Sequence, residues 1–210
     1  MSMFKRFQLW KINKHRTEAF SDGVFAIIIT LLVLEMKVPH LNDHTSSAEL
    51  LDALADMAPK IISWVASFFF ISVMWVQHHN LFRMSEKIDY GMVWLNNIFL
   101  LFICFMPFPT ALMGEYPHNR PAVLLFGLDV TIASLVQVWM YYYVAKNYLL
   151  SHYNQKNVMR NVKRSFMLAP MLLIVATAAS FINYVLPYVI YLTVPFFFLL
   201  PFDEEKENEI

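Results

Sequence analysis

Residues 15–35 read HRTEAFSDGVFAIIITLLVLE, a charged and polar beginning followed directly by a nearly pure aliphatic run. A helix that crosses the hydrocarbon core of a bilayer needs roughly 20 apolar residues. We therefore expect a membrane-spanning helix from about Thr17 to Val38, interrupted by Asp22 and closed by Glu35. An ionised carboxylate in that position is costly against lipid, so Asp22 is expected to meet hydrogen-bond donors on neighbouring helices.

The composition of the whole chain also indicates a protein that lies largely in lipid. Of its 210 residues, 58% are hydrophobic and only 15% are charged, whereas about 25% are charged in soluble domains. The formal net charge is zero, so no nucleic-acid partner is expected. Cys104 is the only cysteine. We expect it to be a small buried apolar residue rather than part of a disulfide or a metal site.

Further stretches without Asp, Glu, Lys or Arg predict more spans. They cover residues 61–82 and 90–114, and a fourth apolar segment follows at 121–145. Residues 165–202 are also free of charge, but as one helix they would extend about 57 Å, roughly twice the hydrocarbon thickness. We place a break at NYVLPY, residues 183–188. The expected fold is an all-α integral membrane protein with six transmembrane helices.

The distribution of basic residues predicts the orientation of these helices. With both termini cytoplasmic, all but three of the 16 Lys and Arg residues lie inside, as the positive-inside rule requires. The three exceptions are Lys37, Lys60 and Arg120. We expect one transmembrane domain over residues 1–210, with a cytoplasmic N-terminus at 1–16 and an acidic cytoplasmic tail at 203–210. The first span is expected to be retained, because no small-residue cleavage site follows it, in a multi-pass protein of the cell (plasma or inner) membrane.

The first span has two different faces when it is drawn as a helix. At about 100° per residue, Ile27, Leu31 and Leu34 form one aliphatic stripe, with Thr30 at its margin. Asp22 points about 140° away from Ile27. Possible partners for its carboxylate lie in the next two spans. They are Trp75, Gln77, His78, His79, Asn80, Asn96 and Asn97.

The pattern Arg16-x-x-x-Phe20-Ser21-Asp22, followed by GVFAIIITLLVLE, resembles the signature of the transmembrane protein 175 family. This family consists of potassium-permeable channels of bacteria and, in a duplicated form, of animal endolysosomes. The resemblance implies that isoleucine and leucine side chains of the first helix form the narrowest part of the pore. Here these residues are Ile27, Leu31 and Leu34, with Thr30 as a possible polar ring.

The resemblance also implies a network that holds the first helix against its neighbours. Its members in this chain are Arg16, Phe20, Ser21 and Asp22, together with Trp75 and the histidine region of the second span. The sequence leaves open which of His78 and His79 takes part. Adjacent residues on a helix diverge by about 100°, so the two histidines are not expected to hold one metal ion, and we expect no metal and no cofactor.

The physical mechanism that remains open to such a chain is a hydrophobic gate. Its four glycines form no TVGYG-like loop, so a carbonyl filter is not expected, whereas an aliphatic constriction gates by dewetting. Potassium holds its hydration water more weakly than sodium, so we expect modest potassium selectivity, with other monovalent cations also passing. One copy of the signature cannot surround a pore, and cyclic symmetry is the natural closure. The resemblance implies a homotetramer.

Two other functional classes are alternatives to a channel. An ion-coupled secondary transporter would use the intramembrane residues Asp22, Asp129 and His78, although carriers usually show internal repeats and broken helices, and neither is evident here. A membrane enzyme would need convergent nucleophile and base chemistry, which no motif provides, so we expect no enzymatic activity. Asp129 is then expected to be a buried hydrogen-bonding group.

Overall fold

The computed structural model describes residues 13–43, 45–147, 168–183 and 185–199, and every element in these ranges is a helix. The expectations for residues 1–12 and for the tail at 203–210 lie outside them. The elements are α2 (Lys14–Leu31), the 3-10 helix η1 (Leu32–Glu35), α3 (Ser47–Asp56), α4 (Ala58–Met84), α5 (Tyr90–Phe105), α6 (Pro107–Glu115), α7 (Arg120–Lys146), α9 (Leu168–Ala179) and α10 (Val185–Leu199).

Four helical segments are long and apolar enough to cross a membrane, within the described residues. They are α2 with η1, α4, α5 with α6, and α7. The all-helical class and the first four predicted spans are thereby confirmed. In place of the fifth and sixth spans, the described residues form two shorter apolar helices of 12 and 15 residues. The predicted break between them is confirmed, since α9 ends at Ala179 and α10 begins at Val185. The six-span count stays a prediction.

The third span is interrupted by a proline. Helix α5 ends at Phe105, and α6 begins at Pro107 with Met106 between them. Proline has no backbone N–H and its ring clashes with the preceding turn, so a helix is kinked or broken there. The helix of the third span is therefore broken at Pro107. A buried bond between Ser67 Oγ and Thr110 Oγ1, 2.7 Å apart, attaches α6 to α4 beyond the break.

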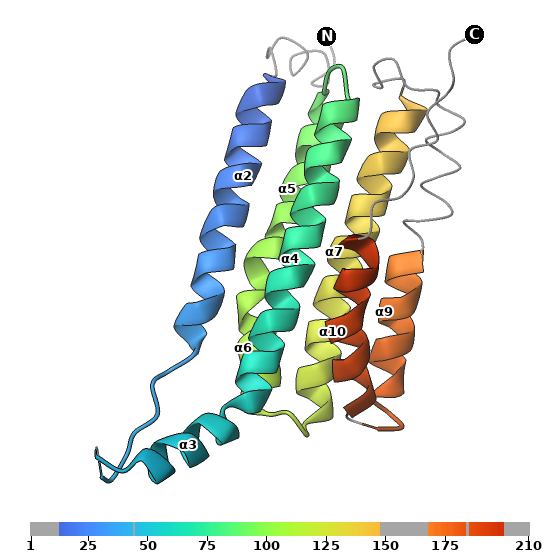
Figure 1. Cartoon of the computed structure of the whole chain (residues 1–210). Helices are drawn as coiled ribbons and strands as arrows, with labels where there is room; N and C mark the ends of the chain where they lie inside the picture. The colour runs from blue at the N-terminus through green and yellow to red at the C-terminus, as the bar shows by residue number, and fades with distance from the viewer. Residues whose placement is uncertain (1–12, 44, 148–167, 184, 200–210) are drawn as a thin grey trace, which may run out of the picture.

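The helices form a bundle in which α7 is central and α2 lies at one edge (Figure 1). In a continuous apolar stretch of 18 residues from each span, 61% of the residues are buried in α7 but only 22% in α2 with η1. Helix α2 packs against α4 and α5, and η1 reaches α6. Most of the surface of α2 is therefore left for lipid or for another protein chain.

The side on which α9 and α10 join the bundle depends on a glycine. A Cβ atom at Gly127 of α7 would overlap the Thr177 and Tyr191 hydroxyls, which lie 2.9 Å apart. The ring of Tyr191 also packs against Phe126 with a centroid distance of 5.1 Å. Since no other residue lacks a Cβ, glycine is needed for this close approach.

Two features differ from the sequence-based expectations. Cys104 is exposed on the surface of the single chain, so the prediction that it is buried is wrong. The reason is that the outward side of a membrane helix is as apolar as its inward side, and hydropathy alone does not separate the two. Helix α3, between the first two spans, was not expected at all.

Helix α3 begins with a signal that is visible in the sequence. Ser46 and Glu49 have the S-x-x-E spacing of a capping box, and Ser46 Oγ accepts a hydrogen bond from the Glu49 N–H at 3.2 Å. The Glu49 carboxylate turns back to the preceding loop, where the backbone N–H groups of Asn42 and Asp43 donate to it at 2.7 and 3.0 Å. These two bonds lower the pKa of Glu49 from its ordinary value.

Candidate functional site

Helix α2 separates its aliphatic side chains onto two faces. Phe25, Ile28 and Leu32 are buried against the chain's own bundle, and the ring of Phe25 packs against the rings of both His78 and Phe99, with centroid distances of 5.7 and 6.0 Å. These contacts fix the rotation of α2 about its axis. The rest of its surface therefore has a defined orientation relative to the bundle.

The expected constriction residues all lie on the uncovered face. Ile27, Leu31 and Leu34 are 58%, 39% and 70% exposed in the single chain. Leu31 is the last residue of α2, and Leu34 lies three residues further on, in η1. Residues three or four apart are neighbours on one face of a helix. The three side chains form a continuous aliphatic stripe, which we call the Ile27–Leu34 stripe.

Thr30 lies beside this stripe and is exposed. Its hydroxyl donates to the backbone oxygen of Ile27 at 2.7 Å and lies 3.2 Å from that of Ala26. The proton is therefore directed at the helix backbone. The oxygen lone pairs remain available to accept from water or to coordinate a cation.

Asp22 meets one of the several partners that the sequence offers for it. Trp75 Nε1 donates to Asp22 Oδ1 at 2.9 Å, joining α2 to α4. The His79 ring lies over Trp75, with centroids 5.9 Å apart and planes tilted by 32°. Asp22, Trp75 and His79 are all exposed in the single chain. This group, the Asp22 cluster, therefore lies on the outer surface of the protomer.

A second, buried group joins three helices. His78 Nε2 of α4 lies 2.7 Å from Asn96 Oδ1 of α5, and Asn96 Nδ2 donates to Ser21 Oγ of α2 at 3.0 Å. The Ser21 hydroxyl lies 2.9 Å from the Thr17 carbonyl oxygen, to which it donates. Every polar group in this chain of bonds has a partner, as burial in an apolar bundle requires.

The two neighbouring histidines lie in different places, one inside the bundle and one on its surface. His78 is 1% exposed and stacks on Phe82 and Phe99 at 4.5 and 5.8 Å, whereas His79 belongs to the exposed Asp22 cluster. Asn96 is the member that sequence reasoning did not assign, although it was considered as a partner for Asp22. Its position among the buried residues of α5, one turn before Phe99 and Leu100, was the available signal.

The other two signature residues are not drawn into either group. Arg16 and Phe20 are exposed in the single chain, Phe20 by 59%. Their predicted contribution to the network stays a prediction. The start of α2 is instead attached by Lys14, whose Nζ donates to the Ser85 carbonyl oxygen at the end of α4 with a distance of 2.7 Å.

Asp129, in the middle of α7, does not behave as expected. It is 3% exposed, but neither carboxylate oxygen has a hydrogen-bond partner among the described residues. The prediction of burial is confirmed, whereas the described residues form none of the hydrogen bonds predicted for it. Among the residues that the structure describes, no three His, Cys, Asp or Glu side chains come together in a way that would hold a metal ion.

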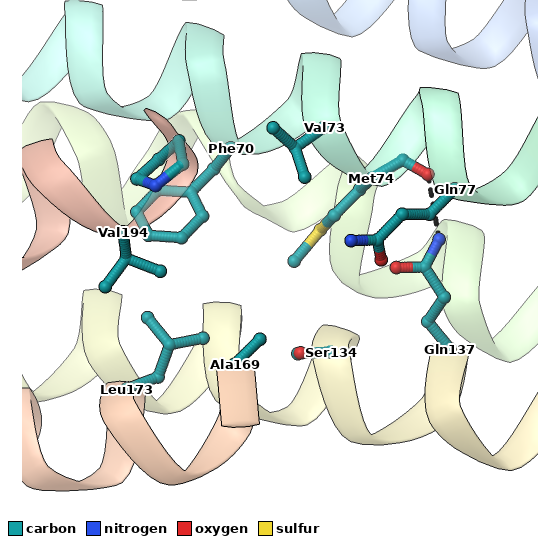
Figure 2. Close-up of a pocket in the computed structure, with 10 residues that line it drawn as sticks. Phe70, Val73, Met74, Gln77, Ser134, Gln137, Ala169, Leu173 and Val194 are labelled. Carbon is teal, nitrogen blue, oxygen red and sulfur yellow. Dashed lines mark hydrogen bonds between the residues drawn. The ribbon is translucent and has the colours of Figure 1, made fainter. Parts of the chain in front are cut away.

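A small cavity lies between α4, α7, α9 and α10, away from α2 (Figure 2). Its volume is about 20 Å³, enough for about one water molecule. Gln77 and Gln137 lie at one end, where Gln137 Nε2 donates to the Met74 carbonyl oxygen at 2.8 Å. Phe70 and Val194 form the apolar end. A cavity of this size offers no passage to a hydrated ion.

Comparison with known proteins bears on the same region. A family model described as "Endosomal/lysosomal potassium channel TMEM175" matches residues 16–107, a range that contains the Ile27–Leu34 stripe and both polar groups. A relative from Chamaesiphon minutus, named a potassium channel, is 37% identical over 173 residues, which is 80% of this chain and 84% of the relative. A Danio rerio relative, named an endosomal/lysosomal proton channel, is 28% identical over 184 residues. That match covers 85% of this chain but 35% of the animal protein.

The fold is similar to that of a solved relative. The crystal structure of a TMEM175 homologue from Chamaesiphon minutus, described as a lysosomal potassium-selective channel homologue, superimposes with a TM-score of 0.78 at 33% identity. The superposition covers 89% of this chain and 96% of that one. With its membrane-spanning helices and these relatives, the chain is a membrane protein that belongs to the TMEM175 family, a family of ion channels and not of enzymes.

Proposed function

We propose that this protein is a potassium-permeable cation channel of the cell membrane, with a modest preference for potassium over sodium. Four identical chains surround a central axis, and α2 of each chain lines the conduit. The observation that carries the proposal is the Ile27–Leu34 stripe, which is aliphatic, continuous and uncovered on a helix whose other face is firmly packed. The names of the relatives support potassium as the permeating ion.

The place of α2 in the bundle supports an assembly of several chains, and their number, four, is what the resemblance to the family implies. Helix α2 lies at an edge and turns the stripe away from its own protomer (Figure 1), so a single chain cannot enclose an ion path with it. Closed cyclic symmetry brings equivalent stripes together without leaving an open end. In this arrangement each protomer is one domain over residues 1–210, with six spans and both termini in the cytoplasm.

The stripe would control ion passage by excluding water from the constriction. A narrow aliphatic ring holds water poorly and gates by dewetting. An ion crossing it gives up part of its hydration shell without gaining protein ligands, and potassium gives up water at lower cost than sodium. The Thr30 oxygens, which lie beside the ring with free lone pairs, lower this barrier for either ion.

Recordings from purified protein in planar bilayers test the proposal. With potassium on one side and sodium on the other, we expect discrete openings and a reversal potential displaced in the direction of potassium selectivity. The carrier alternative, which would use Asp22, Asp129 and His78, predicts saturating flux that requires a second ion gradient and shows no unitary currents. That result would contradict the proposal.

Variants at Asp22 test the role of the Asp22 cluster in assembly. Asparagine keeps an oxygen that accepts the Trp75 Nε1 bond, whereas leucine has none. We expect Asp22→Leu to reduce the yield of assembled oligomer in size-exclusion chromatography by more than half, and Asp22→Asn to stay close to the unmodified protein. Equal losses in both variants would show that the hydrogen bond is not what this residue supplies.

A further inference from the structure

Helix α3 has two chemically opposite faces, and neither is covered. Leu50, Leu51 and Leu54 gather on one side and are 41%, 67% and 43% exposed. The acidic residues of the helix are Glu49, Asp52 and Asp56. At about 100° per residue they fall on the other side. None of the residues of α3 is buried in the chain, so the leucines remain largely uncovered within the described protomer.

The position of α3 indicates what its apolar face meets. Met57 alone separates α3 from α4, as the C-cap of the first and the N-cap of the second, and α4 is one of the helices long and apolar enough to cross the membrane. Figure 1 shows α3 leaving the end of the bundle at a steep angle to α4 and extending away from it. Helix α3 therefore lies at the depth of the membrane surface, where α4 enters the hydrocarbon.

The start of α4, directly after α3, also carries exposed apolar side chains. Ile61 and Ile62, in the first turns of α4, are 38% and 41% exposed. They belong to a helix that is long and apolar enough to cross the membrane. Exposed apolar side chains therefore lie on both sides of Met57, in α3 and at the start of α4.

We propose that α3 is an interfacial helix that lies in the plane of the bilayer surface. Its leucines enter the boundary between lipid headgroups and acyl chains, and its carboxylates face water, as in other amphipathic helices that lie on membranes. A second α3 is a poor alternative partner, because the helix carries three carboxylates and no basic residue to pair with them. For the same reason, the interaction does not depend on anionic lipid.

Anchored in this way, α3 holds the connection between α2 and α4 at a constant depth in the membrane. The inference does not rest on the assignment of α2 to the conduit, since it uses only the membrane-spanning character of α4. It is therefore tested separately from the channel proposal.

Spin labels on opposite faces of α3 test the inference in the full-length chain. Leu54→Cys and Asp56→Cys, each in a Cys104→Ser background, place nitroxides about 160° apart on the helix. The protein is reconstituted in phosphatidylcholine vesicles, and the accessibility of each label to oxygen and to a water-soluble nickel chelate is measured. We expect the Leu54 label to be accessible to oxygen and shielded from nickel, and the Asp56 label to show the reverse.

Two results would overturn the inference. Equal access of nickel to both labels would place α3 in water, and shielding of the Leu54 label from both reagents would mean that protein covers the leucines. The pair Leu50→Cys and Asp52→Cys has the same angular separation and serves as a second set if either first variant fails to fold. Added phosphatidylglycerol is expected to leave all four accessibilities unchanged.

Discussion

Asparagine at Leu31 is expected to raise single-channel conductance several-fold and to reduce the preference for potassium over sodium. Leu31 lies in the middle of the Ile27–Leu34 stripe and is exposed on the uncovered face of α2. An amide there keeps the constriction wet and offers an oxygen to a partly dehydrated ion. A barrier lower by about 1.4 kcal/mol corresponds to about a tenfold faster crossing, and sodium gains more than potassium because its dehydration costs more.

Val33→Asn is the matched control for this prediction. Val33 is also aliphatic, lies two residues from Leu31 and is 43% exposed, but it points away from the stripe. We expect its conductance and reversal potential to equal those of the unmodified channel. Equal effects at both positions, or unchanged flux at Leu31 with lower stability, would remove the stripe from the ion path.

Leucine at Asn96 is expected to destabilise the protein by about 2–3 kcal/mol. The substitution keeps a side chain of similar size but leaves His78 Nε2 and Ser21 Oγ without the partner that joins them. An unsatisfied buried polar group costs about 1–3 kcal/mol. In a chain of this length, the loss corresponds to a fall of about 5–10 °C in Tm, which thermal unfolding in detergent measures.

The neighbouring asparagine provides the control. Asn97 is exposed and has no part in the bonds between α2, α4 and α5. Asn97→Leu is therefore expected to leave Tm within about 2 °C of the unmodified protein, as is usual for surface substitutions. If the two leucine variants unfold at the same temperature, the buried group does not hold α2 in place.

Hydropathy was sufficient to locate the long spans. The second was expected at 61–82 and is Ala58–Met84, and the fourth was expected at 121–145 and is Arg120–Lys146. A chain in lipid must satisfy its backbone internally, so a long apolar stretch has little choice but to form a helix. Helix α3 was missed because a search for spans passes over a short amphipathic segment, although its capping spacing at Ser46 and Glu49 was present.

The sequence predicted only those parts of the candidate site whose geometry depends on a single helix. The Ile27–Leu34 stripe and the opposite direction of Asp22 follow from the pitch of one helix, and Trp75 was among the partners expected for Asp22. The bonds from Ser21 through Asn96 to His78 depend on how three helices are rotated against one another. Apolar membrane helices carry little sequence signal for that rotation, because lipid and core are equally apolar. The exposed position of Cys104 went unpredicted for the same reason.

Silver ions give the most direct test that α2 lines the ion path. Ag⁺ is close to potassium in size and reacts with thiols, so it reaches a cysteine in a conducting constriction. In a Cys104→Ser background, Leu31→Cys is expected to lose its current irreversibly when Ag⁺ is applied to open channels, while Val33→Cys keeps its current. Persistent current through Leu31→Cys, or equal block of both variants, would contradict the account.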